Sequence, residues 1–379
     1  MNENMTYDVC IIGGGLAGLS ASIGLAKFGY TVALFEKEQY PFHKVCGEYI
    51  SLESLEFLES LGLPVSGMGL PIIKQLQVSA PNGNMLEQEL PLGGFGISRY
   101  TIDHALKLIA EQNGVQVFEN CKVEEAVFIN DQSRLQTTLG QFSGKICCGS
   151  FGKRSNIDQK MNRSFFTQKP GKLNNYIAVK YHIHSDFPAD TIALHNFKDG
   201  YCGISAIEEN KYCLCYLTNA NNLKANGNSI QLMEKNILQK NPHLRNIFEH
   251  CEMIYQHPLT ISQISFNRKT QVEDHILMMG DAAGMITPLC GNGMSMSLHA
   301  AKIATGFIHQ FLSGSIDRDT LESVYAAEWD RNFGKRLKTG RKLQKLFGRE
   351  WITNIFLAVM KRSPSLTRKL IRQTHGAPF

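Results

Sequence analysis

The chain has 379 residues, of which 43% are hydrophobic and 19% are charged, a composition that supports a globular protein with a sizeable core. Its ten cysteines are irregularly spaced and form no CxxC pair, which argues against a disulfide framework and against a structural zinc site. No apolar run reaches about 18 residues, so no membrane-spanning helix is expected. The N-terminus leads into a strand pattern without a signal peptide, and we therefore expect the protein in the cytoplasm.

The formal net charge of +5 is unevenly distributed along the chain. Residues 331–379 contain 13 lysines and arginines and one acidic residue, Glu350, so this section carries a net charge of +12 and the remainder carries −7. Charge alone is compatible with nucleic acid, but no other feature supports such a partner, and we expect none.

The first predicted elements form a strand–helix–strand unit. Residues 7–12 (YDVCII) are a continuous apolar run that ends at a glycine, which is typical of a buried parallel strand. Helix-compatible sequence follows as far as Gly29, and a second strand at 31–36 (TVALFE) ends on Glu36.

After this unit the sequence predicts helices and strands in a mixed order. The remaining predicted elements are, in chain order, an amphipathic helix at 99–114, a strand at 115–119, alternating β-rich segments between roughly 158 and 269 with a helical interval near 229–250, a buried strand at 275–280, a long helix from about 293 to 312, and a helical basic section from 317.

A glycine-rich turn joins the first strand to its helix. In GGGLAG, Gly13 permits the tight turn, Gly15 lets a pyrophosphate approach the backbone, and Gly18 lets the helix pack against the strand. The helix N-terminus offers N–H groups and the positive end of its dipole to the phosphates. Glu36, at the end of the next strand, is placed to accept hydrogen bonds from the adenosine ribose. The unit therefore predicts a dinucleotide site.

A second motif, ILMMGDAAGMITPLCGNGM at 276–294, favours FAD over NAD. Asp281 stands at the carboxyl end of a strand, where a carboxylate can hold a polyol hydroxyl. Gly291 and Gly293 open the following helix, whose N–H groups can stabilise negative charge on the pyrimidine edge of a reduced flavin.

The order of five segments, GGGLAG, FEK, PFHKVCGEYIS, SRYTIDHAL and GDAAGMITPLCGNGM, resembles the geranylgeranyl reductase family of FAD-dependent oxidoreductases. That family lies within the superfamily of aromatic hydroxylases and flavin-dependent halogenases. The resemblance is good over residues 6–130 and 270–312. It implies FAD contacts at Gly15, Ala17, Glu36, Cys46, Gly47, Arg99, Val123, Asp281, Gly293 and Met294.

The resemblance also places Cys46, in the KVCG segment, beside the flavin ring. Two interpretations stay open: an active-site thiol, which makes Cys46 the one candidate catalytic residue, or a small side chain that lets the cofactor approach closely. No other side chain stands out in the sequence as an obligatory acid or base.

The sequence departs from the family pattern at two positions. Phe151, in GSFGKRS, stands where many relatives have an aspartate that is associated with FAD and nicotinamide, so NAD(P)H is the expected electron donor but its identity is open. Gly203 stands where the prenyl reductases tend to have a tryptophan, following Tyr201. A smaller lining residue suggests a wider or differently shaped substrate cavity.

Two further patterns have ordinary structural interpretations. His182 and His184 alternate on a predicted strand, and a solvated strand face is favoured over a metal pair because no further ligands are evident. The C-terminal apolar residues Leu343, Leu346, Phe347, Trp351, Ile355 and Val359 recur at helical spacing. We favour an amphipathic helix whose apolar side docks on the core, with peripheral membrane contact through the basic side as the alternative.

We therefore predict an α/β protein with a Rossmann-like FAD-binding domain, an inserted β-rich substrate domain and a C-terminal helical section. The expected function is FAD-dependent oxidoreduction of a hydrophobic small molecule, a prenyl or polyene lipid or an aromatic polyketide-like compound, by double-bond reduction or by hydroxylation through a flavin hydroperoxide. The alternatives are a monooxygenase strictly of aromatic rings and a non-catalytic flavin-binding protein. The predicted boundaries are 1–70, 95–157 and 270–312 for the FAD-binding domain, 71–94 and 158–269 for the substrate-facing sheet, and 313–379 for the C-terminal section.

Overall fold

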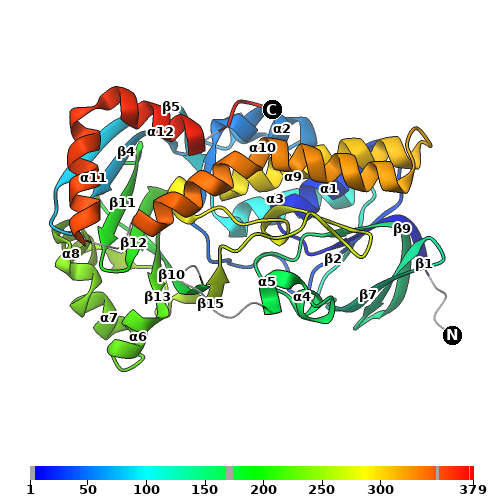
Figure 1. Cartoon of the computed structure of the whole chain (residues 1–379), viewed down its shortest axis with the longest axis horizontal. Helices are drawn as coiled ribbons and strands as arrows, with labels where there is room; N and C mark the ends of the chain where they lie inside the picture. The colour runs from blue at the N-terminus through cyan, green and yellow to red at the C-terminus, as the bar shows by residue number, and fades with distance from the viewer. Residues whose placement is uncertain (1–4, 168–173, 347–349, 375) are drawn as a thin grey trace.

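The computed structural model of the chain describes residues 5–167, 174–346, 350–374 and 376–379. Within these residues the strands form an eight-stranded sheet and a nine-stranded sheet that lie next to each other along the long axis of the molecule (Figure 1). Helices cover both sheets, so the predicted α/β class is confirmed.

The eight-stranded sheet is built around the predicted strand–helix–strand unit. β1 (Met5–Ile12), α1 (Leu16–Lys27) and β2 (Val32–Phe35) follow one another, and β1 pairs in parallel with β2. The sheet has the order β16-β17-β9-β1-β2-β6, and β8 pairs with β9 and β7. Its other strands are β6 (Gln116–Phe118), β7 (Val123–Ile129), β8 (Gln132–Thr137), β9 (Gly140–Gly149), β16 (Val272–Glu273) and β17 (Ile276–Met278).

Four helices pack together next to this sheet. α1 contacts both α3 (Arg99–Gln112) and α9 (Gly293–Leu312), and α9 also contacts α10 (Arg318–Leu346), which runs alongside it (Figure 1). The predicted helices at 99–114 and 293–312 are therefore confirmed. Ser98 begins α3 because its side chain accepts a hydrogen bond from the Thr101 N–H.

The nine-stranded sheet is mainly antiparallel, in the order β14-β10-β13-β12-β11-β4-β5-β3, with β15 pairing with β10. Its strands are β3 (Tyr49–Ser51), β4 (Ile72–Ser79), β5 (Met85–Gly96), β10 (Asn174–His184), β11 (Thr191–Phe197), β12 (Gly200–Ala206), β13 (Tyr212–Asn219), β14 (Glu252–Met253) and β15 (Leu259–Ser265). β3 belongs to this sheet although it lies within the predicted 1–70 segment. A three-residue strand has too short a pattern to be recognised in the sequence.

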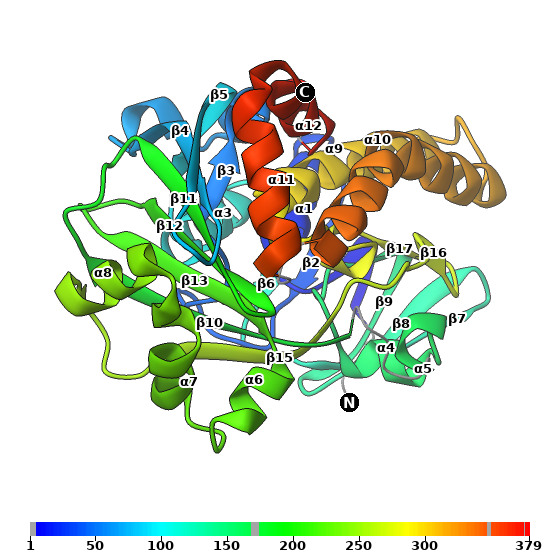
Figure 2. The ribbon, with the colours of Figure 1, turned by 60° about the vertical axis from the view of Figure 1, so that its left-hand side comes forward.

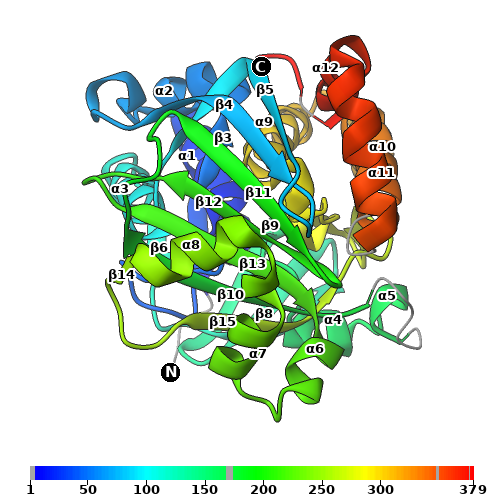
Figure 3. The same cartoon turned by 90° about the vertical axis from the view of Figure 1, so that its left-hand side faces the viewer.

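Alternation along the strands gives this sheet two different faces. On β10, Ile177, Val179 and Tyr181 point to the outer face and pack against the helices α6 (Ala220–Ala225), α7 (Ile230–Asn236) and α8 (Pro242–His250). Figure 3 shows these helices in front of the sheet. Ala178 and Lys180 point to the opposite face, which is turned toward the eight-stranded sheet and the helices on it.

The C-terminal helices α11 (Glu350–Arg362) and α12 (Pro364–Thr374) lie against β5 at the edge of the nine-stranded sheet (Figure 2). Leu357 and Met360 are buried there against β4 and β5. Trp351, Ile355 and Val359 are exposed instead, so the expected docking of α11 through these three residues is wrong. The helix docks through the opposite face, because apolar residues occur on both sides of α11 and their spacing does not show which side is covered. Phe347 lies outside the described residues.

No helix in the described part of the chain is both long enough and apolar enough to span a membrane. The nine cysteines whose side chains the structure describes are free thiols.

The close packing of α1 on β1 makes a test of the fold. A Cβ on Gly18 would lie 2.1 Å from the Gly13 carbonyl oxygen and 2.5 Å from Ser150 Oγ. We expect Gly18→Ala to reduce the free energy of unfolding in urea by about 1–3 kcal/mol, because the backbone must move to accept the methyl group. The control is Gly306→Ala on the exposed side of α9, where the Cβ meets open space. It should stabilise the protein by about 0.5–1 kcal/mol; equal effects would contradict the packing argument.

Candidate functional site

A cavity of about 330 Å³ lies between the two sheets and is closed on one side by the C-terminal helices. One end is lined by Gly15, Arg99, Asp281 and Gly293, and all the charged side chains that line the cavity belong to this end or to the neighbouring loops. The other end is lined by aliphatic and aromatic residues of β4, β11 and α11, which are Leu76, Val78, Ile192, Leu194, Phe356 and Met360. The cavity thus has a polar end and an apolar end.

The glycine turn and the start of α3 meet at the polar end. A Cβ on Gly15 would lie 3.4 Å from Arg99 Nη2, so the guanidinium lies beside the N-terminus of α1. Asp103, one turn along α3, accepts both Arg99 Nε at 2.9 Å and Nη2 at 2.7 Å. This bidentate pair fixes the guanidinium next to the N–H groups at the start of α1, and together they form a site for an anion.

Asp103 and Glu36 share Lys44. Lys44 Nζ lies 2.9 Å from Asp103 Oδ2 and 4.0 Å from Glu36 Oε2. Burial would raise the pKa of the Asp103 carboxyl, but Arg99 and Lys44 outweigh burial and lower it, so Asp103 is a carboxylate. Glu36 accepts the Gly14 N–H at 2.9 Å and thereby ties the end of β2 to the glycine turn.

A buried lysine holds the Asp281 turn (Gly280–Ala282). Lys269 Nζ donates to the carbonyl oxygens of Asp281 and Lys153, each at 2.8 Å, and so joins two loops at the cavity wall. Burial lowers the pKa of Lys269 to about 8, although Asp158 and Asp281 oppose this. Asp281 itself is partly exposed and lines the cavity.

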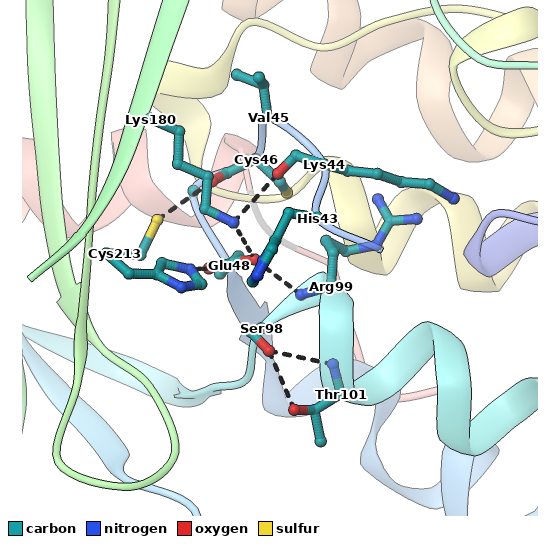
Figure 4. A network of polar contacts seen from close by, with 12 residues as sticks. His43, Lys44, Val45, Cys46, Glu48, Ser98, Arg99, Thr101, Lys180 and Cys213 are labelled. Carbon is teal, nitrogen blue, oxygen red and sulfur yellow. Dashed lines mark hydrogen bonds and ion pairs between the residues drawn. The ribbon is translucent and has the colours of Figure 1, made fainter. Parts of the chain in front are cut away.

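A buried cluster of charged side chains centres on Glu48 (Figure 4). Its carboxylate accepts Lys180 Nζ and the Arg99 N–H, the latter at 2.8 Å, through Oε1, and it lies 2.6 Å from His182 Nε2 through Oε2. Burial would raise the pKa of Glu48, but Lys180 and His182 outweigh it and hold the pKa below the usual 4.5. Burial would lower the pKa of Lys180, and Glu48 raises it above 10.5 instead. Both groups are therefore charged at neutral pH.

The expectation of a solvated strand face at His182 and His184 is wrong for His182, which is buried against Glu48. His182 is covered by Glu48, which comes from a loop that is distant in the sequence. The alternation of residues along the strand cannot show this partner. Donor atoms of Glu48, His182 and Cys213 lie within 4.8 Å of one another. A metal ion at these atoms would face the Lys180 ammonium, so the group is better suited to an ion pair.

Two protein families match parts of the chain. Residues 6–125 match the FAD binding domain family, and residues 203–330 match the squalene epoxidase family. The chain is 25% identical over 399 residues to 1H-pyrrole-2-carbonyl-(peptidyl-carrier protein) brominase of Pseudoalteromonas luteoviolacea, covering 100% of this chain and 94% of the brominase. It is 25% identical over 365 residues to digeranylgeranylglycerophospholipid reductase 2 of Methanothermobacter thermautotrophicus, covering 90% and 88%. A geranylgeranyl bacteriochlorophyll reductase-like structure from Thermoplasma acidophilum superimposes with a TM-score of 0.80 at 16% identity, covering 97% and 95%.

These matches support an FAD-binding enzyme similar to oxidoreductases, halogenases and monooxygenases. The resemblance inferred from the five sequence segments is confirmed, and FAD is confirmed as the cofactor.

Most of the predicted FAD contacts come together in the structure. The residues that line the cavity are Gly15, Ala17, Cys46, Gly47, Arg99, Asp281, Gly291, Gly293 and Met294. Gly13, Gly18 and Glu36 lie behind them in the same turn and in the adjoining strand end. Val123, at the start of β7, is buried but does not line the cavity. The individual contacts remain predictions.

The residues at the positions that depart from the family pattern lie at or next to the cavity. The Phe151 ring packs against Gly149, while its neighbours Ser150, Gly152 and Lys153 line the cavity. Tyr201 lines the cavity and its hydroxyl accepts the Leu289 N–H at 2.9 Å, so it supports the turn before α9. Gly203 lies on the cavity face of β12, where it leaves the surface of the sheet open.

Sequence reasoning missed Glu48, Lys180 and Lys269. Glu48 is visible in KVCGEYIS, and its only local signal is a carboxylate directly after the KVCG segment. Lys180 interrupts an otherwise apolar strand segment, IAVKYHI, and a lysine in a buried strand signals a buried acidic partner. The sequence does not show which acid this is.

The Glu48 cluster predicts a pH-dependent stability. Because the pKa of Glu48 is lower in the folded protein, its contribution is present above pH 4.5 and is lost as the pH falls through the folded-state pKa. We expect Glu48→Gln to cost about 3–5 kcal/mol at pH 7, since Lys180 is left buried without its carboxylate. The cost should shrink below pH 4.5, as measured by urea unfolding across the acid range.

The matched control for this experiment is Glu125→Gln. Glu125 forms a half-exposed ion pair with Lys160 at 3.5 Å, and such pairs contribute less than about 1 kcal/mol. Similar losses for the two variants, or a cost at Glu48 that does not depend on pH, would show that the cluster does not stabilise the fold as described.

Proposed function

We propose that the protein uses FAD to reduce carbon–carbon double bonds of a prenyl or polyene lipid held in the apolar end of the cavity. One observation supports this proposal above all. The same cavity has an end that suits the cofactor's phosphates and an end lined by aliphatic side chains. Apolar lining of this kind binds a hydrocarbon by removing its surface from water. The reductase among the relatives acts, by its name, on a digeranylgeranyl lipid, which supports the same substrate class.

The polar end fits FAD by charge and shape. We propose that Arg99 and the N-terminus of α1 hold the pyrophosphate, with Glu36 at the adenosine ribose and Asp281 at the ribityl chain. The N-terminus of α9 at Gly293 would lie at the pyrimidine edge of the ring. When bound, FAD supplies the transfer of a hydride equivalent between the electron donor and the substrate.

The remaining groups of the chain orient the reactants and exclude water. Cys46 and Gly47 line the cavity between its two ends, and we propose that they lie beside the flavin ring. The Lys153 ammonium lines the same region, where it can attract an anionic electron donor. NAD(P)H is the proposed donor.

A second candidate function is hydroxylation or epoxidation of the same class of lipid. It is favoured by one observation, the match of residues 203–330 to the squalene epoxidase family. These residues include Gly203 and the turn before α9, both at the cavity.

The decisive experiment is anaerobic. The FAD-loaded protein is reduced with NADPH, NADH or dithionite and is incubated with a geranylgeranyl lipid in detergent, and the products are analysed by mass spectrometry. We expect saturation of double bonds without oxygen. If product forms only after oxygen is admitted and carries an added oxygen atom, the reaction is the hydroxylation or epoxidation of the second candidate function and not a reduction. If no electron donor supports turnover, the protein is a non-catalytic flavin-binding protein.

The apolar end can be tested separately from the cofactor site. Leu194→Asp places a carboxylate in the apolar lining, and we expect at least a tenfold rise in KM for the lipid with unchanged FAD affinity, because the charge must lose its hydration when the lipid binds. Leu139→Asp, on an exposed turn, is the control and should alter neither value. Equal KM values for the two variants would exclude this end as the lipid site.

We also propose that the C-terminal helices contact membranes. On α11, Trp351, Ile355 and Val359 are 66%, 57% and 48% exposed and follow one another at intervals of four residues, so they form one apolar stripe. The exposed Lys361 and Arg362 follow this stripe. A tryptophan and aliphatic stripe with basic neighbours suits an anionic lipid surface. Cytoplasmic residence remains a prediction.

Membrane contact is tested by flotation with vesicles. The wild-type protein should float with vesicles that contain phosphatidylserine, less so at high salt, and Trp351→Glu with Ile355→Glu should abolish flotation. The control, Val127→Glu with Ile129→Glu, changes two exposed apolar residues of β7 at the opposite end of the molecule. Flotation that is unaffected by the α11 pair would reject this contact.

A further inference from the structure

The loop at residues 44–47 is held in an unusual way. Each of its four consecutive carbonyl oxygens accepts a hydrogen bond from a side chain of a distant segment. In chain order the donors are Lys180 Nζ to Lys44 O at 3.1 Å, Lys153 Nζ to Val45 O at 3.4 Å, Cys213 Sγ to Cys46 O at 3.2 Å and Ser205 Oγ to Gly47 O at 3.2 Å. Three of the four donors come from the nine-stranded sheet. The whole carbonyl edge of the loop is therefore bound to protein.

The amide edge of the loop is different. In the part of the chain that the structure describes, none of the N–H groups of residues 44–47 donates to a protein acceptor. Val45, Cys46 and Gly47 also line the cavity. These residues are partly buried or, at Gly47, exposed to the cavity, so a ligand in the cavity that carries acceptor atoms can pair with this edge.

Lys180 is the strongest of the four donors because it is a buried cation (Figure 4). It bonds both the Lys44 carbonyl and the Glu48 carboxylate, so it spans the loop from one end to the other. Glu48 has a φ of 55°, a left-handed conformation that a non-glycine residue rarely adopts. Its bonds to Lys180, His182 and the Arg99 N–H hold it there and bend the chain so that the loop turns along the cavity.

We infer that Lys180 is a positioning residue that fixes the carbonyl edge of residues 44–47 on the sheet side and so presents their amides to the flavin ring of FAD. The inference rests on the proposed place of the ring beside Cys46 and Gly47. Ordered N–H groups stabilise negative charge, and the ring gains negative charge when it is reduced. Removal of Lys180 frees the loop and leaves the Glu48 carboxylate without its cation. Both changes disfavour the reduced ring.

The test compares Lys180→Met with Lys180→Arg and uses Lys74→Met, which removes a charge from an exposed position of the same sheet, as the control. The measured quantities are the FAD dissociation constant, the visible absorption spectrum of bound FAD and its midpoint potential. We expect Lys180→Met to weaken FAD binding about ten- to a hundredfold, to shift the spectrum and to move the potential to more negative values. Lys180→Arg should recover part of each change, and Lys74→Met should leave all three unchanged.

Two milder variants keep the inference testable if Lys180→Met does not fold. Ser205→Ala and Cys213→Ala each delete one carbonyl donor without changing a charge, and each should weaken FAD binding by about three- to tenfold and shift the potential in the same direction. Wild-type values in a folded Lys180→Met protein overturn the inference, as do wild-type values in both milder variants. In those cases the wild type still binds FAD and the proposed function stands. A wild-type protein that does not bind FAD overturns both.

Discussion

The arrangement of the site depends on one buried carboxylate. Glu48 lies on the loop that follows β2, yet its oxygen atoms are bonded by Lys180 and His182 of β10 and by the N–H at the start of α3. A carboxylate removed from water is costly unless every oxygen is paired, so all three segments must arrive together for the fold to form. The nine-stranded sheet, the loop and the helix that carries Arg99 are thereby held in one geometry, and the cavity is the space left between them.

This constraint separates the cavity into two chemical environments. The charged groups at its polar end neutralise one another in pairs, Arg99 with Asp103 and Lys180 with Glu48, so they add little net charge but many oriented hydrogen bonds. Lys153 and the helix N-termini then remain as the positive features at that end, which suits phosphates and a reduced flavin. Beyond Gly203, β11 and β4 line the cavity with Ile192, Leu194, Leu76 and Val78. A cofactor and a hydrocarbon can thus meet in the middle without either being placed in the wrong environment.

The sequence predicted what local pattern encodes and missed what long-range pairing decides. The Gly13–Gly18 turn, Arg99 at a helix start, and the Asp281 and Gly293 corner were recognised because each combines a backbone requirement with a fixed spacing. His182 looked like a solvated strand position, because alternation gives the side of a strand but not what covers it. Its partner Glu48 is 134 residues away. The docked face of α11 was misjudged for the same reason, since apolar residues occur on two sides of that helix.

The two apolar sides of α11 have a common physical explanation. One side, with Leu357 and Met360, completes the wall of the apolar end and packs on β4 and β5. The opposite side exposes Trp351 and Ile355, and such exposure is unfavourable in water unless another apolar surface covers it. If the substrate is the proposed lipid, its long hydrocarbon chains reside in membranes, and a wall helix that rests on the bilayer would shorten the path on which the chains contact water. Under that proposal, the helix that closes the cavity is also the element best placed to bring the lipid to it.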